Sequence, residues 1–418
     1  PPDSPENQAI MNKILFQAKY LPNKLETFTA PEIKSNKIKN KFCLGLSVNS
    51  MNNIVFNKIN KWYAYTVNNK IIIEFLENER KQIVIEDSQD ELSCLVMSKD
   101  GKYLLTTVGC TNREEYAPIF VYDTFGFTLK KKLNFHFKGI QHITLSPDNK
   151  YMVSIGTLEE KSICTWNFSN LTVIDSKSVK YNPFCVVCEQ REDSNLYFIT
   201  AAQFVLSFWK INENYKLEGL HLNFGDLVRK RLPGEYITAL ALSPYFTSIK
   251  TSYVLLGTNK GNLMIVDKES KTLFRTYCLR NFPLTKILFI GEHLICAGEG
   301  PIAFCWKFNA NKAKPGNMFS FLETEKRTLL YLDSAVNSLS MSETGEEGLL
   351  TTDIGSIFFL TLNGGNALKI ISSHINCKIN SLDCDISNQN LLSSGGDGGV
   401  RCWLINSFDQ KFLLQKIN

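Results

Sequence analysis

Short apolar runs separated by turn residues dominate the chain from about residue 42 onward. The runs are rich in Val, Ile, Leu and Phe, and turn-forming residues recur about every 8 to 12 positions. This spacing is typical of β-strands, whereas an amphipathic helix places apolar residues three and four positions apart. We therefore predict an all-β fold over residues 42–418.

The first 41 residues have a different pattern. They open on the polar "PPDSPENQ", continue with apolar residues at Ile10, Met11, Ile14 and Leu15, and end in the Lys-rich "APEIKSNKIKNK". The middle part has the spacing of a short amphipathic helix or a docking tail. We predict an N-terminal extension over residues 1–41, partly disordered and with one short helix. Because residue 1 is Pro and not Met, we expect the chain to be a fragment or a processed form.

The strand pattern repeats along the chain. An apolar run, a Ser, a turn and a second apolar run recur, as in "LSCLVMSKDGKYLLTTVG" and "IQHITLSPDNKYMVSIG", and a further strand such as "APIFVYD" or "SICTWNF" follows. Eight such units start near residues 46, 92, 139, 182, 235, 283, 334 and 375. One unit of about four strands cannot bury both of its faces, but a ring of units can. The repeats predict a β-propeller of about eight units, as eight blades or as seven blades plus the opening blade of a second ring.

The Gly-rich stretch "LLSSGGDGGVRCWLIN" raises the possibility of a phosphate-binding loop. Such a loop needs Lys and Ser or Thr after its last Gly, followed by a helix. Here Gly399 precedes the strand-like run "VRCWLI". We therefore interpret Gly396-Asp397-Gly398-Gly399 as a hairpin turn and predict no nucleotide site.

Composition narrows the classes of partner. The net charge of +5 on 418 residues does not indicate nucleic-acid binding, and no apolar run approaches the roughly 18 residues of a membrane span. Most of the twelve cysteines sit within apolar runs, for example Cys94, Cys305 and Cys402. We expect buried free thiols and a reducing compartment.

The sequence contains few motifs that suggest catalysis or metal binding. Cys185 and Cys188 form a C-x-x-C without a second pair, and a strand would point the two thiols to opposite faces. None of the five histidines forms a metal-binding pair, and His142 reads as a satisfied strand side chain. No Ser lies in a G-x-S-x-G motif. We predict no enzymatic activity, no catalytic residues, no cofactor and no metal.

Two basic clusters are candidate partner-binding sites. Lys130, Lys131 and Lys132 end the second unit, and Arg229, Lys230 and Arg231 lie in the connection between the fourth and fifth units. Clustered positive charge attracts an acidic partner surface in a salt-sensitive way. The alternative is that both clusters are ordinary solvated charge.

Several local phrases resemble the WD-repeat family. The residues that match are the turns Ser98-Lys99-Asp100 and Ser146-Pro147-Asp148, the Gly-Asp-Gly at 396–398, and the strand-ending Trp166, Trp209, Trp306 and Trp403. No Trp is followed by Asp, and only His374 stands where the repeat's opening His would be. The resemblance implies a WD-repeat β-propeller from about residue 42 to the end, with Trp side chains in its core.

The second and third units are most similar to the cilia- and flagella-associated WD-repeat proteins. The similarity lies in the "VYD" phrase at Tyr122 and in Ser154-Ile155-Gly156 followed by Trp166-Asn167-Phe168. It implies a non-catalytic scaffold of the cytoplasm and cytoskeleton, in the axoneme of a cilium or flagellum. The implied partners are tubulin or axonemal microtubule-associated proteins in a large assembly, with no nucleic acid and no membrane. The alternative is a cytoplasmic adaptor that gathers signalling or ubiquitin-ligase components.

Overall fold

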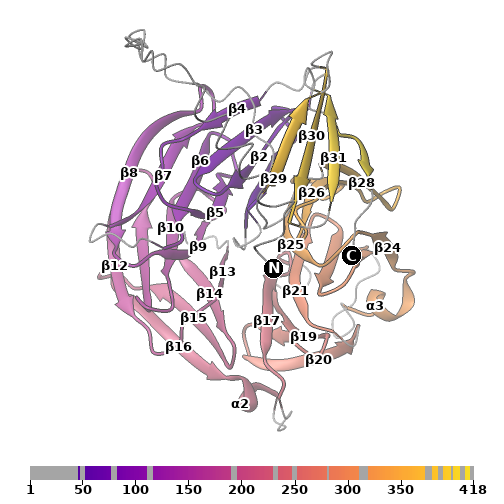
Figure 1. The fold of residues 1–418 in the computed structure, drawn as a ribbon. Helices are drawn as coiled ribbons and strands as arrows, with labels where there is room; N and C mark the ends of the chain where they lie inside the picture. The colour runs from indigo at the N-terminus through magenta and orange to yellow at the C-terminus, as the bar shows by residue number, and fades with distance from the viewer. Residues whose placement is uncertain are drawn as a thin grey trace, which may run out of the picture. The chain divides into compact units, whose positions relative to one another are not determined.

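Eight antiparallel sheets of four strands each make up nearly all regular structure in the described part of the chain (Figure 1). In this computed structural model the described residues are 46–47, 52–76, 82–110, 116–189, 195–228, 234–246, 252–279, 282–309, 319–371, 379–384, 389–396, 399–404 and 410–414. The chain divides into two units, residues 1–40 and 41–418, and every described element belongs to the second. The predicted extension over residues 1–41, with its helix, lies outside the described residues and stays a prediction.

Strand order within each sheet follows the order of the sequence, and we number the sheets 1 to 8 accordingly. Sheets 1 to 4 comprise β1 (Ile54–Asn57), β2 (Trp62–Val67), β3 (Lys70–Phe75), β4 (Gln82–Ile85); β5 (Leu92–Met97), β6 (Tyr103–Val108), β7 (Ala117–Asp123), β8 (Thr128–His136); β9 (Ile140–Leu145), β10 (Tyr151–Gly156), β11 (Ser162–Asn167), β12 (Thr172–Ser178); and β13 (Cys185–Glu189), β14 (Tyr197–Ala202), β15 (Val205–Ile211), β16 (Leu217–Asn223).

Sheets 5 to 8 comprise β17 (Ile237–Leu242), β18 (Tyr253–Thr258), β19 (Asn262–Asp267), β20 (Thr272–Cys278); β21 (Leu284–Ile290), β22 (His293–Gly298), β23 (Ile302–Lys307), β24 (Thr328–Tyr331); β25 (Val336–Met341), β26 (Glu347–Thr352), β27 (Ile357–Thr361), β28 (Asn366–Ile371); and β29 (Ile379–Cys384), β30 (Asn390–Gly395), β31 (Val400–Leu404), β32 (Gln410–Leu414). The helices of the described residues are α2 (Phe224–Val228) and α3 (Phe321–Thr324).

Burial depends on the position of a strand in its sheet. The second and third strands of sheet 1 are buried almost throughout, and their sequences "WYAYTV" and "KIIIEF" are nearly continuous apolar runs. The fourth strand of sheet 2, β8, is exposed over its first five residues. Neighbouring sheets cover both faces of the middle strands. These strands therefore lack the alternation of apolar and polar residues that is typical of a half-buried strand.

Seven sheets close a ring through their first strands. The strands β1, β5, β9, β13, β17, β21 and β25 pack in succession, and β25 packs back on β1. At this seam the Phe56 N–H donates to Ser340 Oγ at 3.0 Å, Thr351 Oγ1 donates to Asn53 Oδ1 at 3.0 Å, and the Phe56 and Phe359 rings meet edge to face. The predicted eight-unit propeller is confirmed as eight sheets, and β29 takes no place between β25 and β1. The structure thus matches seven closed blades followed by one further sheet.

A β-bulge near the start of the first strand recurs around the ring. In sheets 2, 5, 6 and 7 the register with the second strand shifts between Leu92 and Cys94, Ile237 and Ala239, Leu284 and Lys286, and Val336 and Ser338. Three of the residues between these pairs have hydroxyls that donate to the next sheet: Ser93 to Ile140 O at 2.6 Å, Thr238 to Leu284 O at 2.6 Å and Thr285 to Val336 O at 3.3 Å. The bulge re-aims one side chain so that it ties neighbouring sheets together.

The turns singled out in the sequence have the expected roles. In Ser98-Lys99-Asp100, the Ser98 hydroxyl donates to Asp100 Oδ1 at 2.6 Å and accepts from the Tyr103 N–H at 2.9 Å. Ser146-Pro147-Asp148 makes the equivalent bonds at the same lengths. Residues 396–399 join the antiparallel strands β30 and β31, and the Gly395 N–H donates to Gly399 O at 3.1 Å. The hairpin interpretation is confirmed, while Asp397 and Gly398 lie outside the described residues.

The predicted aromatic anchors are in the core. Trp166, Trp209, Trp306 and Trp403 are all buried, at 2 to 5% exposure. The indole N–H of Trp166 donates to Ser154 Oγ, that of Trp209 to Thr200 Oγ1 and that of Trp403 to Ser393 Oγ, at 2.7 to 2.9 Å. Each of these hydroxyls lies on the second strand of the same sheet, so the bond fixes the third strand against it.

Candidate functional site

The lysine cluster Lys130–Lys132 lies on β8, the outermost strand of sheet 2, and all three side chains are exposed. Lys130 Nζ donates to the Tyr103 hydroxyl at 2.9 Å, and this hydrogen bond raises the pKa of the lysine. Lys132 Nζ lies 5.6 Å from the centre of the Phe120 ring. The sheet therefore supports two of the three ammonium groups, and all three present positive charge on the outer edge of the ring.

The second predicted cluster, Arg229–Lys230–Arg231, follows α2 in the connection to β17. It lies outside the described residues. Its role in partner binding therefore stays a prediction.

One loop face of the ring presents exposed apolar side chains. Because neighbouring strands are antiparallel, the connection from the second to the third strand and the connection to the next sheet lie at the same end of each sheet. The first strands of all sheets run in the same direction, so these connections gather on one face of the ring. Its exposed apolar residues are Tyr116, Phe137, Leu158, Tyr181, Phe204 and Phe282. The Tyr116 and Phe137 rings are in contact, with centroids 4.3 Å apart. These two rings form an exposed apolar pair on this face, and such pairs contribute to protein-binding surfaces.

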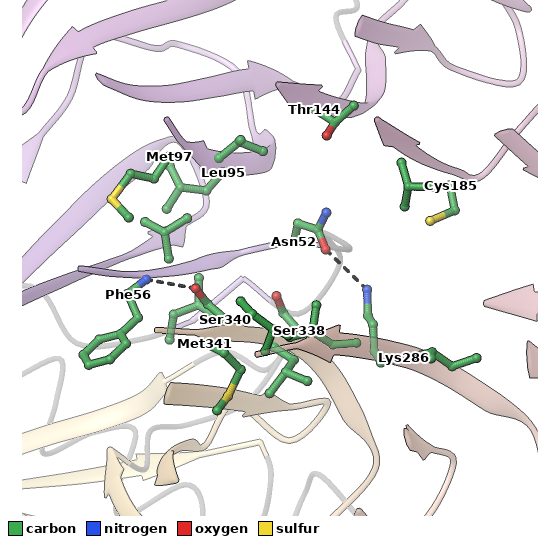
Figure 2. A pocket seen from close by; sticks show the side chains of 18 of the residues that line it. Asn52, Phe56, Leu95, Met97, Thr144, Cys185, Lys286, Ser338, Ser340 and Met341 are labelled. Carbon is green, nitrogen blue, oxygen red and sulfur yellow. Dashed lines mark hydrogen bonds between the residues drawn. The ribbon is translucent and has the colours of Figure 1, made fainter. Parts of the chain in front are cut away.

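The seven first strands surround a central cavity of about 940 Å³ (Figure 2). Its lining extends from the turn at Lys58–Asn60 on one face to Gln203 and Tyr236 on the other. Within it, Lys286 Nζ lies 3.5 Å from Asn52 Oδ1, and Asn52 Nδ2 lies 3.0 Å from His142 Nε2. These three residues come from sheet 6, the segment before sheet 1, and sheet 3, so the bridge crosses the cavity.

The electrostatics of this bridge follow from burial. Burial, and to a smaller extent the positive charge of Lys286, together lower the pKa of His142 to about 4, so His142 is neutral at physiological pH. Burial also lowers the pKa of Lys286, an effect that the nearby Cys185 and Cys94 thiols oppose. Asn52 Oδ1 faces the lysine, so its amide Nδ2 donates to His142 Nε2, and the proton of the neutral imidazole resides on Nδ1.

The thiols of the C-x-x-C are unsuited to nucleophilic chemistry. Cys185 and Cys188 are both free, and burial raises the pKa of both, that of Cys188 to about 12. Thiols of this kind are protonated and poorly reactive at neutral pH. Across the described residues no group of three or more His, Cys, Asp or Glu side chains could hold a metal ion. Cys94, Cys305 and Cys402 are buried and free, as predicted.

Sequence reasoning missed a buried hydrogen-bond chain that links the end of sheet 2 to sheet 3. His136 Nδ1 donates to Glu160 Oε1 at 2.6 Å, and His136 Nε2 lies 2.8 Å from Ser154 Oγ, which also accepts from Trp166. The spacing of 18 residues from His136 to Ser154 and 12 more to Trp166 is the signal that could have identified it. From the sequence, only His374 stood where the opening His of a repeat would be, and it lies outside the described residues.

His142 departs from the satisfied side chain that its sequence context predicts. Nε2 is paired with Asn52, but Nδ1 is buried and has no hydrogen-bond partner among the described residues. Lys286 was not singled out from sequence at all. The available signal was a lysine inside the apolar run "LTKILF", at the position where other first strands carry Cys94, His142 and Ala239.

Comparison with known proteins identifies similar chains. Residues 365–403 match the WD40 family, described as WD domain, G-beta repeat. The chain is 22% identical over 403 residues to WD repeat-containing protein 90 of Mus musculus, covering 93% of this chain and 20% of that protein. It is 24% identical over 255 residues to cilia- and flagella-associated protein 52 of Sus scrofa, covering 58% of this chain and 38% of that protein. The chain thus spans about a fifth and about two fifths of the length of these relatives.

Among solved structures, the chain is similar to the β-propeller domain of Cps50 (Swd1) from Myceliophteria thermophila. The TM-score is 0.52 at 16% sequence identity, covering 75% of this chain and 96% of that one. At this identity the similarity concerns the fold alone. Separately, no helix in the described residues is long and apolar enough to cross a membrane.

Proposed function

Because this chain carries a WD-repeat β-propeller, we propose that it is a non-catalytic scaffold that holds other proteins together in a cilium or flagellum. Its place there is as a structural component of the axonemal microtubules. Its partners are tubulin or the proteins associated with those microtubules.

One observation carries this proposal. The similarity to WD repeat-containing protein 90 covers 93% of the chain, and a second set of similar proteins is named cilia- and flagella-associated protein 52 in animals and in Chlamydomonas reinhardtii. Both relatives are therefore similar to this chain across several sheets of the ring and not only across one repeat. The propeller itself is compatible with many functions, so the proposal rests on these relatives and not on the fold.

The surface of the molecule supports binding over catalysis. The exposed apolar side chains on one loop face offer a contact area, and Lys130–Lys132 on β8 offer a positive edge. Microtubules are strongly acidic, so such an edge adds a salt-sensitive attraction. Each exposed ion pair contributes only about 0–1 kcal/mol, so we expect the lysines to act together and no single one to dominate.

Co-sedimentation with microtubules tests the proposal. We expect the chain to pellet with microtubules or axonemal doublets at low salt, and K130E/K131E/K132E to pellet several-fold less. The matched control is K99E/K150E/K216E, which makes the same charge change at three exposed positions outside β8. Equal loss in both triple variants would assign the effect to net charge and not to β8.

Localisation of a tagged chain in ciliated cells tests whether the protein is a component of the axoneme. We expect the signal along the axoneme, retained after detergent removes the membrane. A diffuse cytoplasmic signal, together with no pelleting on doublets, would overturn the axonemal assignment.

A further inference from the structure

The segment that carries α3 inserts two phenylalanine rings at the junction of sheets 5 and 6. Phe319 and Phe321 are both buried, at 1 and 6% exposure. The ring of Phe319 contacts two aromatic rings of sheet 5, and that of Phe321 contacts two of sheet 6, with centroids 5.2 to 6.4 Å apart. We call these four receiving rings the aromatic site: Phe246 and Tyr253 from the β17–β18 connection and β18, and Phe289 and Phe308 from β21 and the residue after β23.

The backbone of this segment forms a single helical turn. The N–H groups of residues 322–325 donate to the carbonyls of residues 319–321. A helix this short is not stable by itself, so contacts with the sheets hold it in shape. Besides the two phenylalanines, two side chains of β20 supply polar contacts. The Tyr277 hydroxyl donates to the Phe319 carbonyl at 3.1 Å, and Arg275 Nη2 lies 3.4 Å from Glu323 Oε1.

The aromatic site belongs to the sheets and not to the segment that fills it. Tyr253 is part of β18 and Phe289 is part of β21, so strand pairing holds both rings in place. The Phe308 N–H donates to the Glu292 carbonyl. Without residues 319–323 the aromatic site would be uncovered, so it favours any segment that covers these rings in the same way.

We propose that the aromatic site binds a Phe-x-Phe-x-Glu segment of a partner protein, and that residues 319–323 occupy the site as an internal competitor. The observed occupant defines the ligand: two aromatic anchors, a main-chain carbonyl for Tyr277 and an acidic side chain for Arg275. Buried aromatic anchors carry most of the affinity of such sites, and the half-exposed ion pair adds a modest, salt-sensitive attraction. This site is independent of the proposed microtubule contact, because Lys130–Lys132 lie on sheet 2.

Fluorescence anisotropy of the labelled peptide Gly-Phe-Ser-Phe-Leu-Glu-Gly tests the proposal. We expect F319A/F321A to bind this peptide about tenfold more tightly than the parent or better, because its internal competitor has lost both anchors. The same peptide with alanine in place of both phenylalanines should bind neither chain. F125A removes a fully exposed phenylalanine from sheet 2 and should bind as the parent does. Equal affinity of the parent and a folded F319A/F321A overturns the proposal.

A second measurement uses the parent chain and does not require F319A/F321A to fold. Amide hydrogen exchange is followed by mass spectrometry while the unlabelled peptide is added. We expect exchange at residues 322–325 to accelerate, because the displaced segment loses its helical bonds, and exchange in β21 to stay unchanged. A tethered segment acts at an effective concentration of about 1 mM. No acceleration at about 10 mM peptide, tenfold above that value, overturns the proposal.

Two further comparisons define the ligand. A peptide with Lys in place of its Glu should bind several-fold more weakly at low salt and equally at high salt, because it opposes Arg275. Equal binding at low salt overturns the assignment of the acidic residue. A second copy of the chain carries the same segment. Dimerisation of the parent on size-exclusion chromatography, lost in F319A/F321A, would assign the site to exchange between copies and overturn the proposal of a partner protein.

Discussion

At the scale of single residues, the interior is organised by polar atoms that find partners across strands. Glu160 shows this most fully: it accepts from His136 and Ser162, and from the backbone N–H groups of Phe137 and Lys138. Burial by itself would raise its pKa, but these donors outweigh that effect and hold the pKa at about 2, against 4.5 for the free group. The carboxylate thus fixes the connection between sheets 2 and 3.

The lowered pKa of Glu160 predicts a pH dependence. A carboxyl whose pKa is lower in the folded state contributes stability above its unfolded pKa, and that contribution is lost as the pH falls from about 4.5 toward 2. We expect E160Q to melt below the parent at pH 6, and the difference to shrink across this window. E159Q, at the exposed neighbouring carboxylate, is the control in a series of melting curves. A difference that stays constant from pH 6 to pH 2.5 would contradict this account.

A buried ion pair between sheets 4 and 5 predicts a large mutational effect. Lys268 contacts Glu189 and also donates to Ser252, and both charged side chains are less than 10% exposed. K268M leaves the Glu189 carboxylate buried without its cation, so we expect a loss of about 3–5 kcal/mol in the free energy of unfolding. K307M breaks an exposed pair with Glu292 and should change denaturant unfolding little. A loss as small for K268M as for K307M would show that Glu189 is hydrated.

At the scale of elements, the connection from one sheet to the next sets how closely the sheets approach. Gly139 joins β8 to β9 with φ of +145°, and a Cβ built there would lie 2.0 Å from Gly109 O. Its carbonyl also accepts from the Thr157 N–H at 3.0 Å. The three segments meet so tightly at this point that only a residue without a side chain fits.

Two glycine substitutions test this close approach. G139A must displace the backbone at Gly109 and adopt an unfavourable φ, so we expect a loss of about 2 kcal/mol or more in denaturant unfolding. Gly225 in α2 has open space around its Cβ position and no positive φ. G225A should leave stability unchanged or raise it by about 0.5–1 kcal/mol. Similar losses in both variants would indicate that side-chain volume at Gly139 is tolerated.

At the scale of the whole molecule, closure of the ring falls between sheets 7 and 1. The seam is made by β1 against β25, with Lys58 and Glu347 3.1 Å apart at its edge. Sheet 8 follows the closed ring, and every residue of its first strand β29 is exposed, including Ile379 and Leu382. In the first strands of the seven ring sheets every residue is buried or half-buried.

This arrangement predicts different effects of removing the two end sheets. Deletion of residues 375–418 removes sheet 8 and leaves the seam intact, so we expect a monomeric chain with a single cooperative melt close to that of the parent. Deletion of residues 41–86 removes the same number of strands but destroys the seam, and we expect aggregation on size-exclusion chromatography. Unfolding or aggregation of the chain that lacks residues 375–418 would indicate that sheet 8 is part of the ring.

Sequence patterns predicted the eight units because short local motifs mark the units, such as the turn Ser98-Lys99-Asp100 and the Trp anchors. They left open whether seven or eight units close, because closure depends on curvature summed around the whole ring and not on any short motif. The cavity bridge was not predicted for a related reason. Asn52 and Lys286 are separated by 234 residues, and only the closed ring brings them together.

The seam also has a consequence for synthesis. Phe56 and Ser340, which bond across it, are 284 residues apart, while all strands within a sheet pair with their immediate neighbours in the chain. A ribosome adds roughly 5–20 residues per second, so sheet 1 waits on the order of tens of seconds for its partner. During that interval the apolar side chains of β1 and β3 that later meet sheet 7, such as Ile54 and Ile72, remain uncovered. The nascent chain therefore keeps an apolar face exposed until sheet 7 has been made, even after most of its other sheets have paired.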